Sequence, residues 1–521
     1  MAGYTEAKFV KQYEPGNQDR VELVHGRIVD VVHGCYYDAG TRIILQGDQI
    51  EALPGLAGEP ADVQADCTID LQGKTVLPGL FNTHCHLLQF ESTFIPGLSD
   101  MRQIKRYREQ QIAKNLADCL ARGITHVRDA WHPDLSENRA LKEQISRGEI
   151  PGPRIQQSVV VGPVGSYMQE RPSLALRILG VPHVDDPSTR DAGAVAFATD
   201  ATEQEVRDAV DVAIDERGAD AIKILDEPYS FLARKPVPVM TVEQLCALTD
   251  QARCRGVQST MHHTTVESFR RGTKAGVSSL AHAPIDALLT PGDVEAFKAS
   301  GGLNDSTVSA IYAILSWKVG KARSNGHPEL DRLTQFRDKT YTFDTIADEY
   351  YLPELRASVL SGYKKCASGK PKMMGIMDMS ANYEWSEKTS TWFENFRLLH
   401  EHGVPMTTAN DNKPPCTPAM MDLELLMMDH LLKGDPGQAP LSGVGAVQIA
   451  TINSARSLGL EASFGSIEKG KTADLVILDG DPLADFRAIG SRVAALFMDG
   501  KLVINNCGLE VACSGQLPAR L

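Results

Sequence analysis

Several features that would place the chain in a membrane, in a secretory route or among nucleotide-binding folds are missing from its sequence. No apolar run is long enough to cross a bilayer. Residues 1–20 are polar and contain no apolar h-region, so we expect no secretory signal. No Gly-x-Gly-x-x-Gly follows the first strand-like segment and no Walker motif occurs. Their absence weakens the case for an open nucleotide-binding sheet.

Cysteine is present, but without the spacing of a metal or disulfide motif. The 10 cysteines are scattered and show no Cys-x-x-Cys pattern. This scatter argues against a zinc knuckle or a disulfide framework. It fits a reducing cytoplasm, which is the location we expect.

The chain has fewer positively than negatively charged residues. The chain has 53 Lys and Arg against 67 Asp and Glu, a net charge of −14. A nucleic acid is therefore not an expected partner, and solubility alone explains the acidity. With 521 residues, the chain is long enough for a large core in two or more structural units.

Both ends of the chain are rich in short strand-like segments separated by turns. These segments cover residues 27–32, 41–45, 473–478, 494–498 and 501–504. The two β-rich ends flank a middle part with a different pattern of segments. We therefore interpret the ends as one small sheet domain built from both termini.

The middle of the chain alternates between helix-like and strand-like segments. Helix-like residues 104–122, 203–217, 242–255, 266–275 and 396–402 each lead through a glycine into an apolar strand. The glycines stand where a helix C-cap belongs. Such repeated units predict a parallel sheet with crossover helices, closed or open. Residues 306–380 fit no such unit, and we interpret them as a helical insertion or a lid over the site.

The apolar run from Val76 to Leu87 ends in two histidines, His84 and His86. On a β-strand, residues i and i+2 point to the same side, so both imidazoles can reach one point. That arrangement suits a metal ion. A strand with two histidines satisfied by other contacts is the alternative, because a His-x-His pair alone is a weak motif.

Further polar residues lie at the carboxyl ends of the predicted strands, where barrel active sites are built. They are His84, His86, Lys223, His262, His282 and Asp411. Lys223 lies within Ala-Ile-Lys-Ile-Leu, and a buried ammonium needs a partner. One explanation is a salt bridge with Asp226 or Glu227. The other is reaction with CO₂ to a carbamate, an anionic ligand that can bridge two metal ions.

The motifs, taken in order, resemble the amidohydrolase superfamily, and most closely its imidazolonepropionase and metal-dependent prolidase-like branch. The resemblance covers most of the chain. Its segments are residues 73–86 with His-x-His, 123–129, 218–223 with the lysine, the single histidines 262 and 282, 403–411 with the aspartate, and 465–478.

This resemblance implies an α/β fold, a (β/α)8 TIM barrel with a small composite β-sandwich domain from both termini. Expected limits are 1–77 and 461–521 for the two parts of the β-sandwich domain and 78–460 for the barrel. It also implies a binuclear centre of divalent ions, commonly Zn²⁺. The expected ligands are His84, His86 and Asp411 for the first ion, His262 and His282 for the second, and N6-carboxylated Lys223 as the bridge. The ligand types suit zinc but leave manganese, cobalt and iron open.

The resemblance assigns Asp411 the catalytic proton transfer, from the attacking water to the leaving nitrogen. A strand-end carboxylate of this kind also fits a turn cap. The chain departs from the family at Asn82, where Asp is usual, and at Ala409-Asn-Asp411, where Gly-Thr-Asp is usual. After His282 it has Ala283 in place of glycine. We expect these changes to affect the substrate more than the reaction type.

Candidate substrate contacts are Tyr167, His126, Arg128 and His263. His126 and Arg128 share one side of their strand and suit either substrate binding or the core. The side chain of His263 should point away from that of His262, so packing or support of the site is the alternative for it.

The expected function is metal-dependent hydrolysis of an amide C–N bond, open-chain or cyclic, in a small organic or dipeptide-like substrate. Hydrolysis of an ester, carbamate or organophosphate by the same centre is the nearest alternative. A non-catalytic scaffold is a further one, but such a scaffold should lack several ligands. We expect a small-molecule substrate, no nucleic-acid or membrane partner, and a homo-oligomer.

Overall fold

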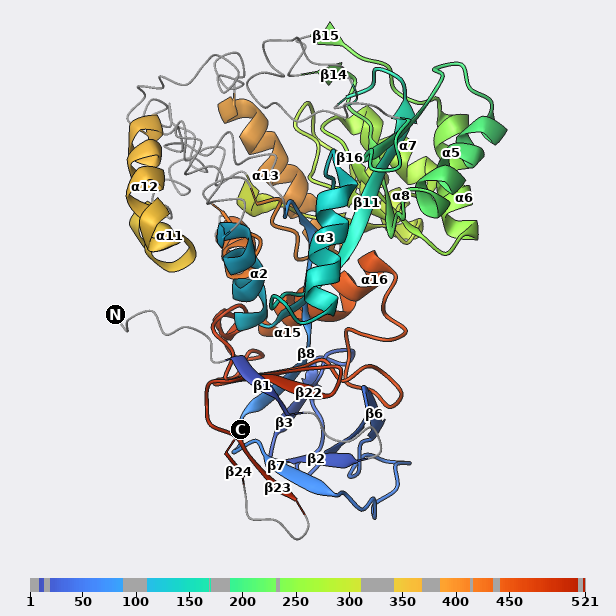
Figure 1. Cartoon of the computed structure of the whole chain (residues 1–521). Coiled ribbons are helices and arrows are strands. Elements are labelled where there is room, and N and C mark those ends of the chain that lie inside the picture. The colour runs from blue at the N-terminus through green and yellow to red at the C-terminus, as the bar shows by residue number, and fades with distance from the viewer. Residues whose placement is uncertain are drawn as a thin grey trace.

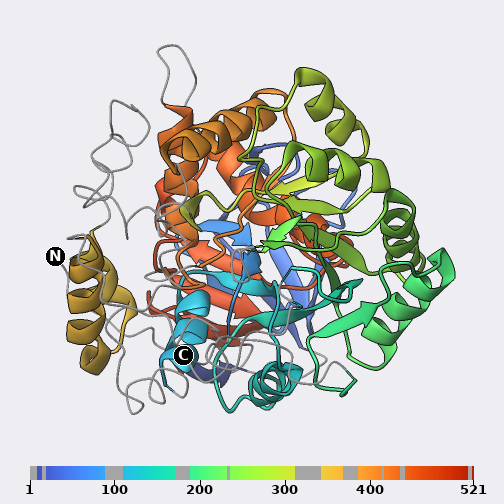
Figure 2. The same ribbon diagram turned by 90° about the horizontal axis from the view of Figure 1, so that it is seen from above.

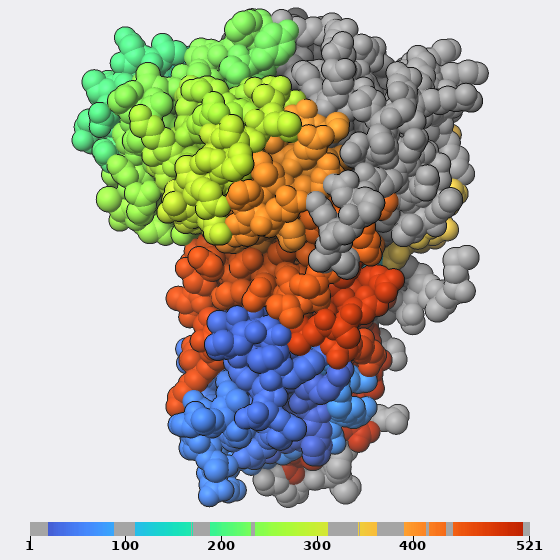
Figure 3. All heavy atoms as spheres, turned by 180° about the vertical axis from the view of Figure 1, so that it is seen from behind, coloured from blue at the N-terminus to red at the C-terminus, as the bar shows by residue number. Residues whose placement is uncertain are grey.

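The computed structural model describes residues 9–13, 19–87, 110–167, 169, 188–230, 235–310, 342–367, 385–412, 416–433, 441–513 and 519–520. A barrel of strands and helices stands on a smaller all-β unit (Figure 1). Seen from behind, the smaller lobe combines the start of the chain with its end (Figure 3). No helix among these residues has the length and apolar content needed to cross a membrane.

Strands from both termini build the smaller unit, as the sequence predicts. One sheet has the order β1-β22-β21-β20-β8-β3-β4 and the other β24-β23-β7-β2-β5-β6. The N-terminal strands are β1 (Phe9–Tyr13), β2 (Arg20–Val24), β3 (Arg27–Asp30), β4 (Cys35–Tyr36), β5 (Ile43–Gln46), β6 (Gln49–Ala52), β7 (Cys67–Asp70) and β8 (Thr75–Pro78). The C-terminal strands are β20 (Leu475–Leu478), β21 (Ala495–Met498), β22 (Lys501–Asn505), β23 (Glu510–Cys513) and β24 (Ala519–Arg520).

Direct strand pairing joins the two ends of the chain. β8 pairs antiparallel with β20, and β7 pairs antiparallel with β23. Residues of these strands, such as Val76, Ile69 and Leu475, point into one buried apolar cluster. The composite β-sandwich is therefore confirmed.

Cysteine behaves differently from the sequence expectation at one pair. Cys67 of β7 and Cys513 of β23 form a disulfide that links the N-terminal and C-terminal parts of the β-sandwich. The expectation of a chain without disulfides is wrong here, because residues far apart in sequence become neighbours through strand pairing. The cytoplasmic location and the homo-oligomer stay predictions.

The larger unit is a parallel barrel. Its strand order is β19-β18-β17-β16-β13-β11-β10-β9, with β12 paired to β11. The strands are β9 (Leu80–Cys85), β10 (Ile124–Asp129), β11 (Arg154–Pro163), β12 (Ala194–Phe197), β13 (Ala221–Leu225), β16 (Gln258–His262), β17 (Ser279–Ala281), β18 (Leu303–Asp305) and β19 (Met406–Thr407). The Thr83 amide donates to the Thr408 carbonyl at 2.8 Å, which connects the last strand to the first. The expected TIM barrel is confirmed.

Helices surround these strands, as the view from above shows (Figure 2). They are α2 (Ile112–Ala121), α3 (Leu135–Ser146), α5 (Glu203–Asp215), α6 (Val242–Cys254), α7 (Val266–Ala275), α8 (Pro291–Ala299), α13 (Trp385–Glu401), α14 (Met421–Leu432), α15 (Gly443–Gln448) and α16 (Ser454–Leu458), with a π-helical turn at Ile449–Asn453 and a 3₁₀ turn at Phe486–Ala488. A short hairpin of β14 (Tyr229–Ser230) and β15 (Lys235–Pro236) follows β13.

The glycines chosen as helix ends adopt the left-handed conformation that a C-cap needs. Gly123, Gly218, Gly256, Gly276 and Gly403 have φ between 67° and 81°. A side chain at such a position would be strained. The glycine pattern therefore located the turns into β10, β13, β16, β17 and β19 correctly.

Three barrel strands, β11, β12 and β18, were not predicted. β11 is the longest strand of the barrel, with 10 residues. β18 has only 3 residues, Leu-Asn-Asp, too short and too polar to be recognised as a strand.

The predicted insertion at residues 306–380 is helical where it is described. It contains α11 (Phe343–Tyr350) and α12 (Pro353–Ala367). Both lie at the outer edge of the barrel (Figures 1 and 2). Arg122 of the barrel pairs with Glu349, and Gln111 donates to the Tyr350 carbonyl at 2.7 Å. Residues 311–341 and 368–380 lie outside the described residues, so a lid over the site stays a prediction.

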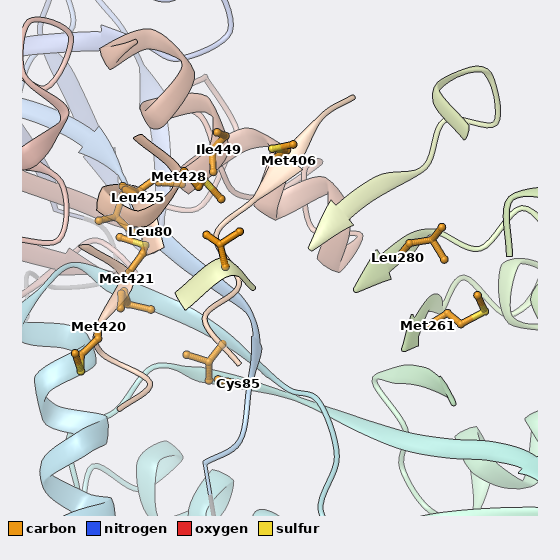
Figure 4. Close-up of a cluster of buried hydrophobic side chains, with 14 of the residues drawn as sticks. Leu80, Cys85, Met261, Leu280, Met406, Met420, Met421, Leu425, Met428 and Ile449 are labelled. Carbon is orange, nitrogen blue, oxygen red and sulfur yellow. The ribbon is translucent and has the colours of Figure 1, made fainter. Parts of the chain in front are cut away.

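The main core fills the space between barrel strands and helices. Figure 4 shows part of it, where Met421, Leu425 and Met428 of α14 join Leu80 and Cys85 of β9 in one buried cluster. This packing holds the outer helices on the strands, so the strand ends form a rigid base for loops.

Inside the barrel, polar contacts replace apolar packing around a fully buried ion pair. Arg128 of β10 donates to Asp305 of β18 at 2.5 Å, and both side chains are 0% exposed. Arg128 also donates to the Thr83 carbonyl at 2.7 Å and the Ser457 carbonyl at 3.0 Å. All three guanidinium nitrogens therefore serve buried groups, and we assign Arg128 to the barrel interior instead of to substrate binding.

Asp305 gathers hydroxyl groups from several strands at this point. Thr407 and Thr83 donate to one carboxylate oxygen at 2.7 and 2.9 Å, and Ser279 donates to the other at 2.8 Å. A buried charge is tolerated only when its partners are this complete.

Breaking this ion pair should make the barrel less stable against unfolding. We expect Arg128→Met to lower the free energy of unfolding by about 3–5 kcal/mol, because Asp305 would keep a buried charge without its counter-ion. Urea denaturation measures this loss. The double variant Arg128→Met/Asp305→Asn should lose less free energy of unfolding than Arg128→Met alone.

A surface pair provides the control. Asp250 and Arg253 pair at 2.8 Å with exposed side chains, so Asp250→Asn should change the free energy of unfolding by less than about 1 kcal/mol. Equal losses in Arg128→Met and Asp250→Asn would contradict the role of the buried pair.

Candidate metal centre

The first barrel strand presents the two motif histidines at its carboxyl end. His84 lies within β9 and His86 directly follows it. Nδ1 of His86 lies 3.3 Å from the Trp131 carbonyl oxygen. This contact directs Nε2 of His86 to the other side, toward Asp411 at 3.2 Å.

Asp411 comes from the far end of the barrel sequence but lies beside the first strand. Its Oδ1 is 3.9 Å from Nε2 of His84, and its backbone amide donates to the His84 carbonyl at 2.8 Å. One ligand atom from each of His84, His86 and Asp411 lies within 4.8 Å of the others, a group that could hold a metal ion.

Two further histidines meet on neighbouring strands. His262 ends β16 and His282 follows β17. Nδ1 of His262 and Nε2 of His282 are 2.9 Å apart. Tetrahedral ligand nitrogens about 2.05 Å from zinc lie roughly 3.3 Å apart, so this pair is close to the spacing of two ligands of one ion.

The opposite ring nitrogens of these two histidines have polar neighbours. Nδ1 of His282 and the hydroxyl of Thr307 are 2.6 Å apart. Nε2 of His262 lies 3.8 Å from Oε2 of Glu227. Metal-ligating histidines commonly have a carboxylate, carbonyl or other polar group at the second nitrogen, which fixes the ring orientation.

Lys223 lies within electrostatic range of both groups of ligands. Its side chain is buried within β13, and its charge acts on both His84 and His282. The rings of His84 and His282 are 5.5 Å apart. The structure therefore places His84, His86 and Asp411 in one group, His262 and His282 in a second, and Lys223 within electrostatic range of both. The nearby carboxylates have other contacts as well, since Asp226 pairs with Arg271 at 3.2 Å and Glu227 accepts from Thr264.

Burial keeps the central histidines neutral. It lowers the pKa of His84 well below its usual value, and the charge of Lys223 lowers it further. Burial, and then the neighbouring His262, lowers the pKa of His282 in the same way. Neutral imidazole is the form that binds metals.

Three residues at this site adopt the left-handed backbone conformation. His282, Thr307 and Asp411 adopt φ of 74°, 51° and 35°. Non-glycine residues with positive φ are uncommon, and a β-branched residue such as Thr307 is an outlier there. Strain of about 1–3 kcal/mol per residue persists where the surroundings enforce it, typically at functional sites.

The predicted substrate contacts divide into one at the site and three away from it. The ring of Tyr167 stacks 5.5 Å from that of His262. His263 is fully buried beside Phe269, and burial lowers its pKa to about 3. His126 stacks on Phe81 and contacts Phe464 at the β-sandwich end of the barrel. His126 and His263 therefore pack in the core, as Arg128 does.

Sequence reasoning did not identify the buried hydrogen bonds that support the loops next to the ligands. Glu424 of α14 accepts the amides of Val308 and Ser309 at 2.9 and 2.8 Å and the hydroxyl of Ser306 at 2.7 Å. Burial raises the pKa of Glu424 to about 7. These bonds hold the loop that carries Thr307. A polar Ser-Thr pair after β18 was the available signal, but β18 itself was not recognised.

Comparison with known proteins places this arrangement in a family. The model of the amidohydrolase family matches residues 75–316 and 350–503. An imidazolonepropionase from Pseudomonas paraeruginosa is 46% identical over 79 residues, which cover 15% of this chain and 18% of that protein. The chain thus matches about a fifth of the length of this curated relative.

Solved structures extend the likeness of the fold to nearly the whole chain. An Xaa-Pro dipeptidase has a TM-score of 0.62 at 20% identity, covering 93% of this chain and 100% of that chain. A molinate hydrolase has a TM-score of 0.61 at 18% identity, covering 93% and 95%. The family model spans both the β-sandwich return and every strand that carries a candidate ligand, and the chain belongs to the amidohydrolase family.

Proposed function

We propose that the chain is a metal-dependent hydrolase that cleaves an amide C–N bond, open-chain or cyclic, in a small organic or dipeptide-like substrate. The convergence of His84, His86 and Asp411 within 4.8 Å carries this proposal. Family membership supports the reaction class. The similar proteins are named as an imidazolonepropionase, an Xaa-Pro dipeptidase and a molinate hydrolase, which supports a small-molecule substrate.

The donor set fits a pair of divalent ions. His84, His86 and Asp411 would hold the first ion, and His262 and His282 the second. Imidazole nitrogen with carboxylate oxygen is a typical zinc environment, so zinc is the proposed metal. When bound, the ions would lower the pKa of a shared water and polarise the scissile carbonyl.

Lys223 would complete the centre as N6-carboxylysine. The neutral Nζ attacks the carbon of CO₂, a C–N bond forms, and the nitrogen releases a proton to leave a carbamate anion. Its electrostatic contact with members of both groups of ligands supports this role. An ammonium in that place would repel cations, whereas a carbamate would offer them oxygen ligands.

Asp411 would move the proton. Its carboxylate, buried beside His84 and His86, accepts a proton from the attacking water and returns it to the leaving nitrogen as general base and then general acid. The hydrogen bond from its backbone amide to the His84 carbonyl holds the carboxylate at the strand end. Tyr167 would contact the substrate, since its partly exposed ring stacks on His262.

Metal removal should abolish activity. Protein from zinc-supplemented medium should contain about two divalent ions per chain, and chelation should remove activity until zinc is restored. Elemental analysis with an assay before and after chelation measures both. His86→Ala should lose metal, whereas His25→Ala, an exposed histidine, should not. A wild-type protein without bound transition metal would favour the scaffold alternative.

Loss of Lys223 should reduce metal content and activity together. We expect Lys223→Ala to lower activity by at least ~100-fold, a loss at the upper end for contacts that support a metal site. Short carboxylic acids should restore part of both, because they can supply the missing oxygen ligands. Lys235→Ala, at an exposed position, is the control. Full activity of Lys223→Ala would remove the carbamate from the proposal.

Matched amide and ester substrates separate the two hydrolase alternatives. The zinc-loaded enzyme should cleave members of a library of N-acyl amino acids, dipeptides, lactams and aryl amides. Steady-state rates for each amide and its ester counterpart provide the comparison. Turnover of esters alone would show that the proposed bond type is wrong.

A further inference from the structure

Three buried asparagines connect the Asp411 segment to the first barrel strand. Asn82 lies two residues before His84, and Asn410 and Asn412 flank Asp411. All three are at most 1% exposed. Nδ2 of Asn82 donates to Oδ1 of Asn410 at 2.9 Å. On the other side, Oδ1 of Asn412 accepts the His86 amide at 2.8 Å and its Nδ2 donates to the His86 carbonyl at 3.1 Å.

The surrounding carbonyls fix the direction of the Asn82–Asn410 bond. Nδ2 of Asn82 also faces the Pro418 carbonyl at 2.9 Å, and Nδ2 of Asn410 faces the Thr417 carbonyl at 2.8 Å. A carbonyl accepts only, so each amide must turn its NH₂ group toward it. Asn410 then presents its oxygen to Asn82, and only a donor at position 82 satisfies that oxygen.

The direction of this bond links the choice of residue at position 82 to the residue at position 410. An aspartate at 82 would bring a carboxylate against Oδ1 of Asn410 and the Pro418 carbonyl, with no hydrogen to donate. A threonine at 410 would instead offer a hydroxyl that can donate to a carboxylate. The residues at positions 82 and 410 are therefore chemically matched to each other.

We propose that Asn82, Asn410 and Asn412, which we call the asparagine clamp, position Asp411 against His84 and His86, and that residues 82 and 410 work as a matched pair. The proposal rests on the proposed metal-dependent function. The clamp residues are positioning residues, since they bond to one another and to the backbone beside the ligands. Asp411, with φ of 35°, needs such support to keep its conformation.

Exchanging the donor at position 82 and the acceptor at position 410 tests the pairing. In the wild-type background, Asn82→Asp and Asn410→Thr should each weaken zinc binding about 10–100-fold, as loss of supporting contacts at a metal site does. In the Asn82→Asp background, Asn410→Thr should instead strengthen it, because the hydroxyl can donate to the new carboxylate. Chelator competition measures zinc affinity, and the visible spectrum of the cobalt-loaded protein reports ligand geometry.

A third asparagine supplies the control. Asn505 of the β-sandwich donates to the Leu509 carbonyl at 3.0 Å and accepts its amide at 2.8 Å. Asn505→Asp removes an equivalent buried donor but should leave zinc affinity and the cobalt spectrum unchanged. Equal effects of Asn505→Asp and Asn82→Asp on zinc affinity would show that general destabilisation, not the clamp, is responsible.

The remaining outcomes distinguish a failure of the clamp proposal from a failure of the proposed function. Additive effects of Asn82→Asp and Asn410→Thr on zinc affinity would overturn the matched pair while leaving the metal centre intact. A wild-type protein that binds no metal would overturn the proposed function. In that case, the free energies of unfolding in urea of the wild type, Asn82→Asp, Asn410→Thr and the double variant would still test the pairing. If Asn82→Asp does not fold, recovery of folding by adding Asn410→Thr supports the pair, and failure to recover overturns it.

Discussion

The ion pair between Arg128 and Asp305 is the contact on which the candidate site depends. Its partners belong to β9, β10, β16, β17, β18 and β19 and to α16. Thr83 immediately precedes His84, and Ser279 and Thr260 precede His282 and His262 on their strands. Because the buried pair fixes these residues, the strand ends beyond them are held relative to one another.

Directly beyond this rigid layer, the chain adopts strained conformations at His282, Thr307 and Asp411. Each follows one of the consecutive strands β17, β18 and β19. The bonds that Glu424 accepts from the Val308 and Ser309 amides, and the bond from the Asp411 amide to the His84 carbonyl, stabilise these turns. Strain at three adjacent strand ends is compatible with folding because the layer beneath it is fully satisfied.

The sequence predicted the repeating helix and strand units and the candidate metal ligands, but not the contacts that support those ligands. Glycine caps and apolar runs identify a helix and strand locally, so Gly218 or Gly276 could be placed without tertiary information. β18 was missed because its Asn304 and Asp305 face polar partners from other strands, which removes the apolar pattern. For the same reason the sequence could not separate substrate binding from a core role for Arg128, since its counter-ion lies 177 residues away.

The charges behind the ligands differ between the two halves of the proposed centre. Asn82 accepts the backbone amide of His84 at 3.3 Å, whereas Glu227 places a carboxylate oxygen 3.8 Å from Nε2 of His262. Carboxylates near a metal-ligating imidazole are common outer contacts of such sites. The second group has the Glu227 carboxylate near its imidazole, whereas the first group has the Asp411 carboxylate among its own candidate ligands. Two ions held in these positions would not be equivalent, and the one beside Asp411 would be the more sensitive to the geometry of that carboxylate.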